Sequence, residues 1–83
     1  MVEKKLLMKS SLETNQVAKL VQNANNYKAE LNISTMGKNA NVKSIMGVIS
    51  LGMLDGVEIT ISGKGDDEVE AIDFIYGFLS KLI

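Results

Sequence analysis

Apolar and polar residues alternate along four segments of the chain and recur at helical spacing along others. Alternation over residues 2–9, 29–34, 39–43 and 57–62 predicts four strands. Helical spacing predicts one helix from about residue 13 to about residue 27 and another that runs to about residue 81. A short apolar helix is predicted after Ser44. The order is therefore βαββαβα, an α+β arrangement in which helices cover one face of a four-stranded antiparallel sheet.

The connections between these segments favour turns and helix starts. Residues 35–38, Thr-Met-Gly-Lys, predict a hairpin turn in which Gly37 supplies a positive φ, and the short polar strand that follows suits a sheet edge. Residues 63–65, Gly-Lys-Gly, predict a second turn, after which Asp66 or Asp67 is expected to cap the last helix. The core side of that helix is predicted to consist of Val69, Ile72, Ile75, Tyr76, Leu79 and Ile83.

Ser44 stands where the N-cap of the short helix belongs, so its side-chain oxygen can accept a hydrogen bond from a first-turn amide. The helix is apolar on more than one side, and one face is therefore expected to serve something other than the core. A phosphate on Ser44 would add about 1.5 to 2 negative charges, which the positive end of the helix dipole would stabilise. The alternative is that Ser44 is a helix cap and nothing more.

The composition argues against several classes of function. The chain of 83 residues predicts one domain, residues 1–83, with a net charge of −1 and no basic block of the kind that binds nucleic acid. We expect a cytoplasmic protein, because there is no Cys, no signal peptide and no apolar run that could span a membrane. There is no His and every basic residue is Lys, so the usual catalytic arrangements cannot be assembled. We therefore expect neither an enzyme nor a metal or other cofactor.

Segment 41–47, NVKSIMG, together with the chain length and the element order, resembles HPr, the phosphocarrier of the bacterial sugar phosphotransferase system. Further matches are Ala24-Asn25 at the end of the first helix, Gly37-Lys38 before the short strand, and the strand at 57–61 that leads into Gly65-Asp66-Asp67-Glu68. The resemblance covers nearly the whole chain. It implies an open-faced β-sandwich with three helices on one face. It also implies that Ser44 is the regulatory site phosphorylated by an HPr kinase/phosphorylase.

The chain departs from the family at the phosphocarrier motif. Where phosphocarriers have a motif like G-L-H-A-R-P-A, residues 11–17 read Ser-Leu-Glu-Thr-Asn-Gln-Val. Glu13 replaces the phosphoryl-accepting His, Asn15 the Arg that steadies the phosphate, and Gln16 the Pro. We therefore expect no phosphoryl relay to sugar transporters. Glu13 either imitates a permanently phosphorylated carrier or is an ordinary acid in a first turn. The second interpretation is favoured, because one carboxylate carries about half the charge of a phosphate.

This departure is similar to that of catabolite-repression HPr, a branch of the family that lacks the active-site His and keeps the regulatory Ser. The resemblance implies a partner, a catabolite-control repressor of transcription, that uses the Ser-phosphorylated form as corepressor. Ile45, Met46 and Ile49 would supply apolar contacts around the phosphate. Family members also contact that repressor through the Arg that Asn15 replaces here.

Two other classes of function fit parts of the sequence. The first is an HPr-fold docking module with no phosphorylation and an unrelated protein partner, which treatment with an HPr kinase and ATP would distinguish. The second is an unrelated α/β domain that binds a small ligand or RNA. That second class needs a basic and aromatic surface, and the sequence lacks one.

A second apolar stripe is predicted on the last helix, at Phe74, Phe78 and Leu82. The stripe is displaced from the core side, and Gly77 beside it would let another surface approach. Apolar patches of this kind mark interfaces when they are exposed. We therefore expect a weak homodimer. The alternative is that the curvature of the sheet or a neighbouring helix covers the stripe.

Overall fold

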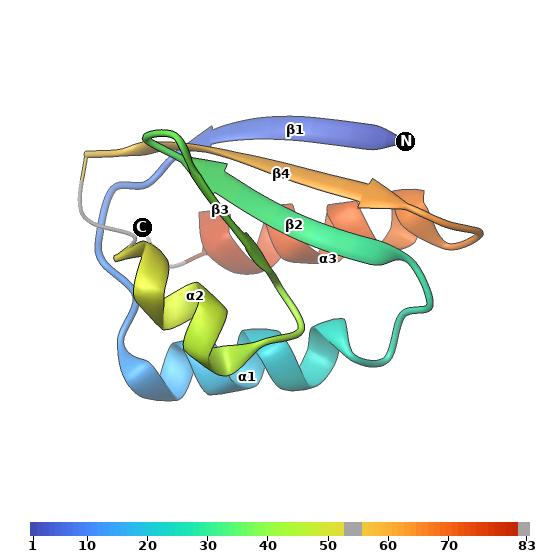
Figure 1. Ribbon diagram of the computed structural model, residues 1–83, viewed down its shortest axis with the longest axis horizontal. Helices are drawn as coiled ribbons and strands as arrows, with labels where there is room; N and C mark the ends of the chain where they lie inside the picture. Colours follow the sequence, from blue (N-terminus) through green and yellow to red (C-terminus); the bar gives the residue numbers. More distant parts are fainter. Residues whose placement is uncertain (53–55, 82–83) are drawn as a thin grey trace.

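The computed structural model describes residues 1–52 and 56–81, and these residues contain the predicted order of strands and helices (Figure 1). The elements are β1 (Val2–Leu7), α1 (Thr14–Ala24), β2 (Glu30–Thr35), β3 (Lys38–Asn41), α2 (Ile45–Leu51), β4 (Glu58–Lys64) and α3 (Glu68–Ser80). The predicted βαββαβα order is confirmed. The largest difference in length is at α1, which was predicted to run to about residue 27 and ends at Ala24. Helix α2 ends at a left-handed Gly52, and Asp55 lies outside the described residues.

The four strands form one antiparallel sheet in the order β1-β4-β2-β3. The first strand of the chain therefore pairs with the last one, with Val2 opposite Gly63 and Leu7 opposite Glu58. The short polar strand β3 lies at one edge of the sheet, as its sequence predicts. Strand β1 forms the other edge.

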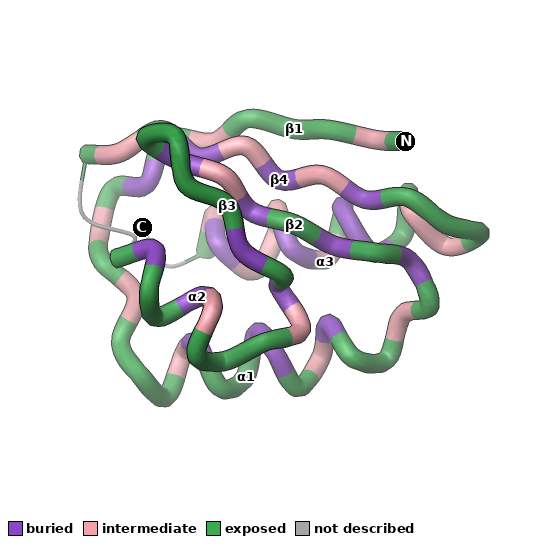
Figure 2. The backbone as a smooth tube through the Cα atoms, viewed as in Figure 1, coloured by how far each residue is buried: buried purple, intermediate pink, exposed green. Residues whose placement is uncertain are grey.

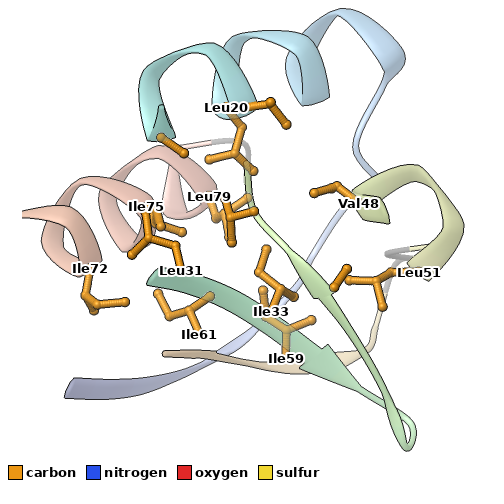
Figure 3. Packing of buried hydrophobic residues seen from close by; sticks show 14 of the residues in the cluster. Leu20, Leu31, Ile33, Val48, Leu51, Ile59, Ile61, Ile72, Ile75 and Leu79 are labelled. Carbon is orange, nitrogen blue, oxygen red and sulfur yellow. The ribbon is translucent and has the colours of Figure 1, made fainter. Parts of the chain in front are cut away.

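All three helices lie against the same face of the sheet, and the core fills the space between the two layers (Figures 1 and 3). Buried and more exposed residues alternate along β2 and β4, as expected for strands with one face on a core (Figure 2). Side chains from α1, α3, β2 and β4 meet in this space and are fully buried, including Leu20, Leu31, Ile33, Ile59, Ile61, Ile75 and Leu79. The fold is therefore the predicted open-faced sandwich.

The hairpin between β2 and β3 turns through two residues, Met36 and Gly37, whose φ angles are 50° and 76°. Two consecutive left-handed residues match the twist of the flanking strands. The predicted hairpin is thus confirmed, and Met36 shares with Gly37 the positive φ that was expected of Gly37 alone.

The predicted turn at residues 63–65 is wrong for its first two residues, because Gly63 and Lys64 complete β4. A Cβ at Gly63 would lie 3.0 Å from a side-chain carbon of Ile72, so the glycine lets α3 pack directly on the strand. Gly63 is therefore needed for the packing of α3 on the sheet and not for a turn.

Two predictions for α3 also need correction. Asp67 occupies the N-cap position, but its carboxylate makes no capping bond and instead accepts hydrogen bonds from the Lys28 and Ala29 amides. Val69 is 57% exposed, and Ala71 takes a core position in its place. Tyr76 is half-buried, and Ile83 lies outside the described residues.

Candidate functional site

Ser44 is the N-cap residue of α2, as predicted. Its backbone is extended, with φ −114° and ψ 115°, and its carbonyl accepts the first helical bond from the Val48 amide at 3.0 Å. The Ser44 Oγ accepts a hydrogen bond from the Gly47 amide at 3.1 Å. A Cβ at Gly47 would lie 3.3 Å from the Ser44 Oγ, so Gly47 leaves room for the capping hydroxyl. The side chain of Ser44 is exposed and open to modification from solvent.

Helix α2 carries apolar residues on two sides. One side packs on the core, and the other faces solvent. Val48 and Leu51 are buried. On the other side, three apolar side chains remain exposed, Ile45 by 43%, Met46 by 72% and Ile49 by 44%. Large apolar side chains gathered next to an exposed serine form a surface suited to protein contact. We call this surface, Ser44 with Ile45, Met46 and Ile49, the α2 face.

Hydrogen bonds hold the residue before Ser44, Lys43, against the end of α1 and the residues that follow it. The Lys43 Nζ donates a hydrogen bond to the Tyr27 carbonyl at 2.6 Å, and the Asn25 side-chain amide lies 3.4 Å from the Lys43 carbonyl. The Lys43 amide in turn donates to the Asn41 side chain at 2.8 Å. These contacts were not predicted from the sequence. The Asn41 turn is a local signal that could have been found, whereas the Tyr27 partner requires the tertiary fold.

Glu13, Asn15 and Gln16, the residues that the family resemblance aligns with the phosphocarrier motif, lie at the start of α1. Glu13 is the N-cap residue, and its amide donates a hydrogen bond to the Gln16 side chain at 2.8 Å. The Gln16 amide lies 3.0 Å from the Asn15 side-chain oxygen. This arrangement satisfies amides that a helix start leaves without intrahelical partners. In place of the Pro of the phosphocarrier motif, Gln16 thus supplies a hydrogen-bond acceptor for capping.

A hollow of about 120 Å³ lies between the start of α1 and the side of α2. Leu12 and Val17 line it in the N′ and N4 positions of α1, the positions that pack together in a hydrophobic staple. Ile49 of the α2 face lines it from the other helix. The structure therefore places the start of α1 next to the α2 face. Leu12 was not predicted as part of this surface, although an apolar residue just before an N-cap is a recognisable signal.

The chemistry available at this surface is that of an exposed hydroxyl beside apolar side chains. Within residues 1–52 and 56–81, no three His, Cys, Asp or Glu residues are grouped in a way that could hold a metal ion. None of the helices in the described part of the chain is long and apolar enough to cross a membrane. The two carboxyl groups with lowered pKa values, Asp67 and Glu68, lie at the start of α3 and do not belong to this surface.

Comparison with known proteins agrees with this geometry. The family model PTS-HPr, described as the PTS HPr component phosphorylation site, matches residues 4–81. The HPr-like protein Crh of Halalkalibacterium halodurans is 40% identical over 83 residues, which span 98% of this chain and 99% of that protein.

Solved structures give the same result for the fold. The phosphocarrier protein HPr of Bacillus anthracis is 36% identical, with a TM-score of 0.88 and coverage of 94% of this chain and 95% of that one. The crystal structure of the catabolite repression protein Crh of Bacillus subtilis is 34% identical, with a TM-score of 0.79 and coverage of 98% and 95%. That crystal structure is described as a dimer with a swapping domain. Through the match of its sequence over residues 4–81 and of its fold, this chain belongs to the PTS HPr family.

Proposed function

We propose that this protein is a regulator of carbon metabolism in the manner of Crh, phosphorylated on Ser44 by an HPr kinase/phosphorylase and not acting as an enzyme. The observation that carries the proposal is the α2 face, where an exposed serine caps a helix that presents three exposed apolar side chains. The relatives that are named Crh, and in one case a catabolite repression protein, support the same role.

The Ser44-phosphorylated form binds a transcriptional regulator, a catabolite-control repressor, through the α2 face. The phosphate supplies charge and acceptor oxygens, and Ile45, Met46 and Ile49 supply apolar area around it. Unphosphorylated protein lacks the charge that pairs with basic groups of the partner. Binding is therefore expected to depend on the kinase reaction.

The test is treatment with an HPr kinase/phosphorylase and ATP, followed by intact-mass measurement. Wild-type protein is expected to gain one phosphate, and Ser44→Ala none, while losing about 1 kcal/mol of capping. Ser50→Ala is the matched control, because Ser50 is exposed on the same helix and its hydroxyl donates to the Met46 carbonyl at 2.7 Å. Phosphate on Ser44→Ala would place the site elsewhere. An unmodified wild-type protein would favour a docking module that works without phosphorylation.

The His-dependent relay is tested separately with phosphoenolpyruvate and the first enzyme of the phosphotransferase system. The chain contains no His, so its mass is expected to stay unchanged. An acid-labile phosphate in this assay would contradict the proposal and would point to an acyl phosphate on Glu13.

A further inference from the structure

The outer side of α3 carries an apolar hollow that the Ser44 function does not use. Phe74 lies between two other rings, with 6.0 Å between the ring centroids of Tyr27 and Phe74 and 5.9 Å between those of Phe74 and Phe78. Both Phe side chains are half-buried against the core, so the predicted second stripe is partly covered. Leu82, predicted as its third member, lies outside the described residues. The hollow measures about 370 Å³ and is lined by Asp73, Phe74, Gly77, Phe78 and Lys81.

Gly77 has no role in packing within the described chain. A Cβ at this position would meet no atom within 4 Å, and the residue has no positive φ that would call for glycine. A glycine inside a helix costs about 1 kcal/mol relative to alanine, and it is usually found where a packing or functional reason offsets that cost. The absent side chain opens the helix surface from outside, which suits the close approach of a second helix.

The charged residues of the hollow are arranged symmetrically about Gly77. Asp73 and Lys81 are four residues before and after it, about 6 Å along the helix axis in each direction. If two copies of α3 cross in antiparallel orientation at Gly77, Asp73 of each copy lies beside Lys81 of the other. Lys81 is exposed, and the Lys4 ammonium contacts Asp73 through Oδ1, at 2.9 Å. Such self-complementarity is what a twofold interface requires.

We propose that α3 forms a homodimer interface in which two copies cross antiparallel at Gly77. Phe74 and Phe78 of each copy cover the hollow of the other, and two Asp73–Lys81 pairs close its ends. The occupant is a second copy of this chain because the charge pattern is complementary to itself. A single helix face buries less than about 1,200 Å², the range of weak and transient complexes. This interface exchanges no strand between chains and does not depend on the state of Ser44.

The first test measures sedimentation of the full chain from about 10 μM to about 1 mM, a range that brackets weak association. Wild-type protein is expected to pass from monomer to dimer. Gly77→Gln, whose Cβ would have no other atom within 4 Å, is expected to weaken the dimer at least tenfold without lowering the thermal midpoint. Ala18→Gln, on the exposed side of α1, is the matched control and is expected to dimerise as wild type does.

The second test reverses the charges. Asp73→Lys and Lys81→Asp, made singly, are each expected to weaken dimerisation, and the double variant is expected to restore it. The single variant Asp73→Lys and the double variant both lose the ion pair with Lys4. Stronger dimerisation of the double variant than of Asp73→Lys therefore measures the pair between residues 73 and 81 of different chains. A monomer across the whole range overturns the proposal. So does a dimer that is insensitive to Gly77→Gln, as a strand-swapped dimer would be, or a double variant no better than Asp73→Lys.

Discussion

The carboxylate of Asp67 joins the start of α3 to the loop that follows α1. It accepts hydrogen bonds from the Lys28 amide and from the Ala29 amide, each at 2.8 Å, across 39 and 38 positions of sequence. The bond from Lys28, foremost, lowers the pKa of Asp67 below its ordinary value of 3.8, because amide donors stabilise the charged form. Glu68 has a lowered pKa for a similar reason, through the Gly65 amide and the N-terminal ammonium.

The Asp67 bonds predict a pH dependence of stability. A folded-state pKa below the unfolded one gives stability that is complete above the unfolded pKa, about 4, and is lost as the pH falls through the folded-state pKa. We expect Asp67→Asn to lower the thermal midpoint at pH 7, and the difference from wild type to shrink towards pH 2. Thermal unfolding between these pH values is the measurement, with the exposed neighbour Asp66→Asn as control. A constant difference at every pH would contradict this account.

Asn15 gives a second prediction at this scale. It is exposed at the start of α1, where the family resemblance implies an Arg that contacts the repressor. We expect Asn15→Arg to strengthen binding of the Ser44-phosphorylated protein to a catabolite-control repressor about tenfold, because a charge-assisted hydrogen bond contributes about 1.5–3 kcal/mol. Calorimetric titration measures the change, and Asn15→Gln is the uncharged control. Equal affinities for all three proteins would show that the partner uses another surface.

At residue scale, the distance along the chain between bonding partners decides what sequence can predict. Ser44 was correctly identified as a cap because its partner, the Gly47 amide, is three residues away. Asp67 stands at the predicted N-cap position, but its carboxylate bonds to amides more than thirty residues away, which nothing local in the sequence indicates. The chemical role of Ser44 came from resemblance to the HPr family and stays a prediction.

Helix α3 shows where pattern analysis fails at the scale of an element. Its residues are apolar around much of the circumference, so periodicity alone does not mark one core face. Val69 was placed in the core and Ala71 was not, whereas packing against β4 and β1 buries Ala71 and leaves Val69 57% exposed. In helix α1, by contrast, the apolar residues Val17, Leu20, Val21 and Ala24 form one narrow stripe, and all four are buried, so periodicity alone marks the core side even though the helix ends earlier than predicted.

The connection between β4 and α3 gives a prediction about element spacing. Gly65 has a φ of +151°, and a Cβ there would lie 2.7 Å from the Ala29 Cα. We expect Gly65→Ala to destabilise the fold by about 1–3 kcal/mol or more, because a backbone clash adds to the strain. Urea unfolding measures the loss. Gly37→Ala is the control, since Gly37 also has a positive φ but has open space around it, and its cost should be smaller, about 1 kcal/mol. Equal losses would rule out the clash with Ala29.

At the scale of the whole molecule, the sheet order implies that β1 docks late in folding. Strand β1 pairs only with β4, the most distant strand in sequence, whereas β2 and β3 are joined by a two-residue turn. Closing the longer loop costs more entropy, so the hairpin is expected to form earlier. The N-terminal ammonium and Lys4 then fasten β1 to α3 through ion pairs with Glu68 and Asp73, at 3.1 and 2.9 Å.

Stopped-flow kinetics test this order. Leu6→Ala in β1 removes a half-buried side chain and is expected to cost about 1–2 kcal/mol, almost wholly as faster unfolding. Ile33→Val in β2 removes one buried methyl group, at about 0.5–1.5 kcal/mol, and is expected to slow folding instead. If Leu6→Ala slowed folding as much as Ile33→Val does for the same loss of stability, β1 would belong to the folding nucleus.

The same register has a consequence during synthesis on the ribosome. Val2 and its partner Gly63 are 61 positions apart, so at about 5–20 residues per second roughly 3–12 s separate their translation. Once it has left the ribosome, the newly made first strand has no complementary strand in its own chain until β4 follows, and during that time it is accessible to chaperones or to a neighbouring nascent chain on the same messenger RNA. Translation speed and the spacing of ribosomes on the messenger RNA then decide whether the first strand pairs with β4 of its own chain or with β4 of a neighbouring chain.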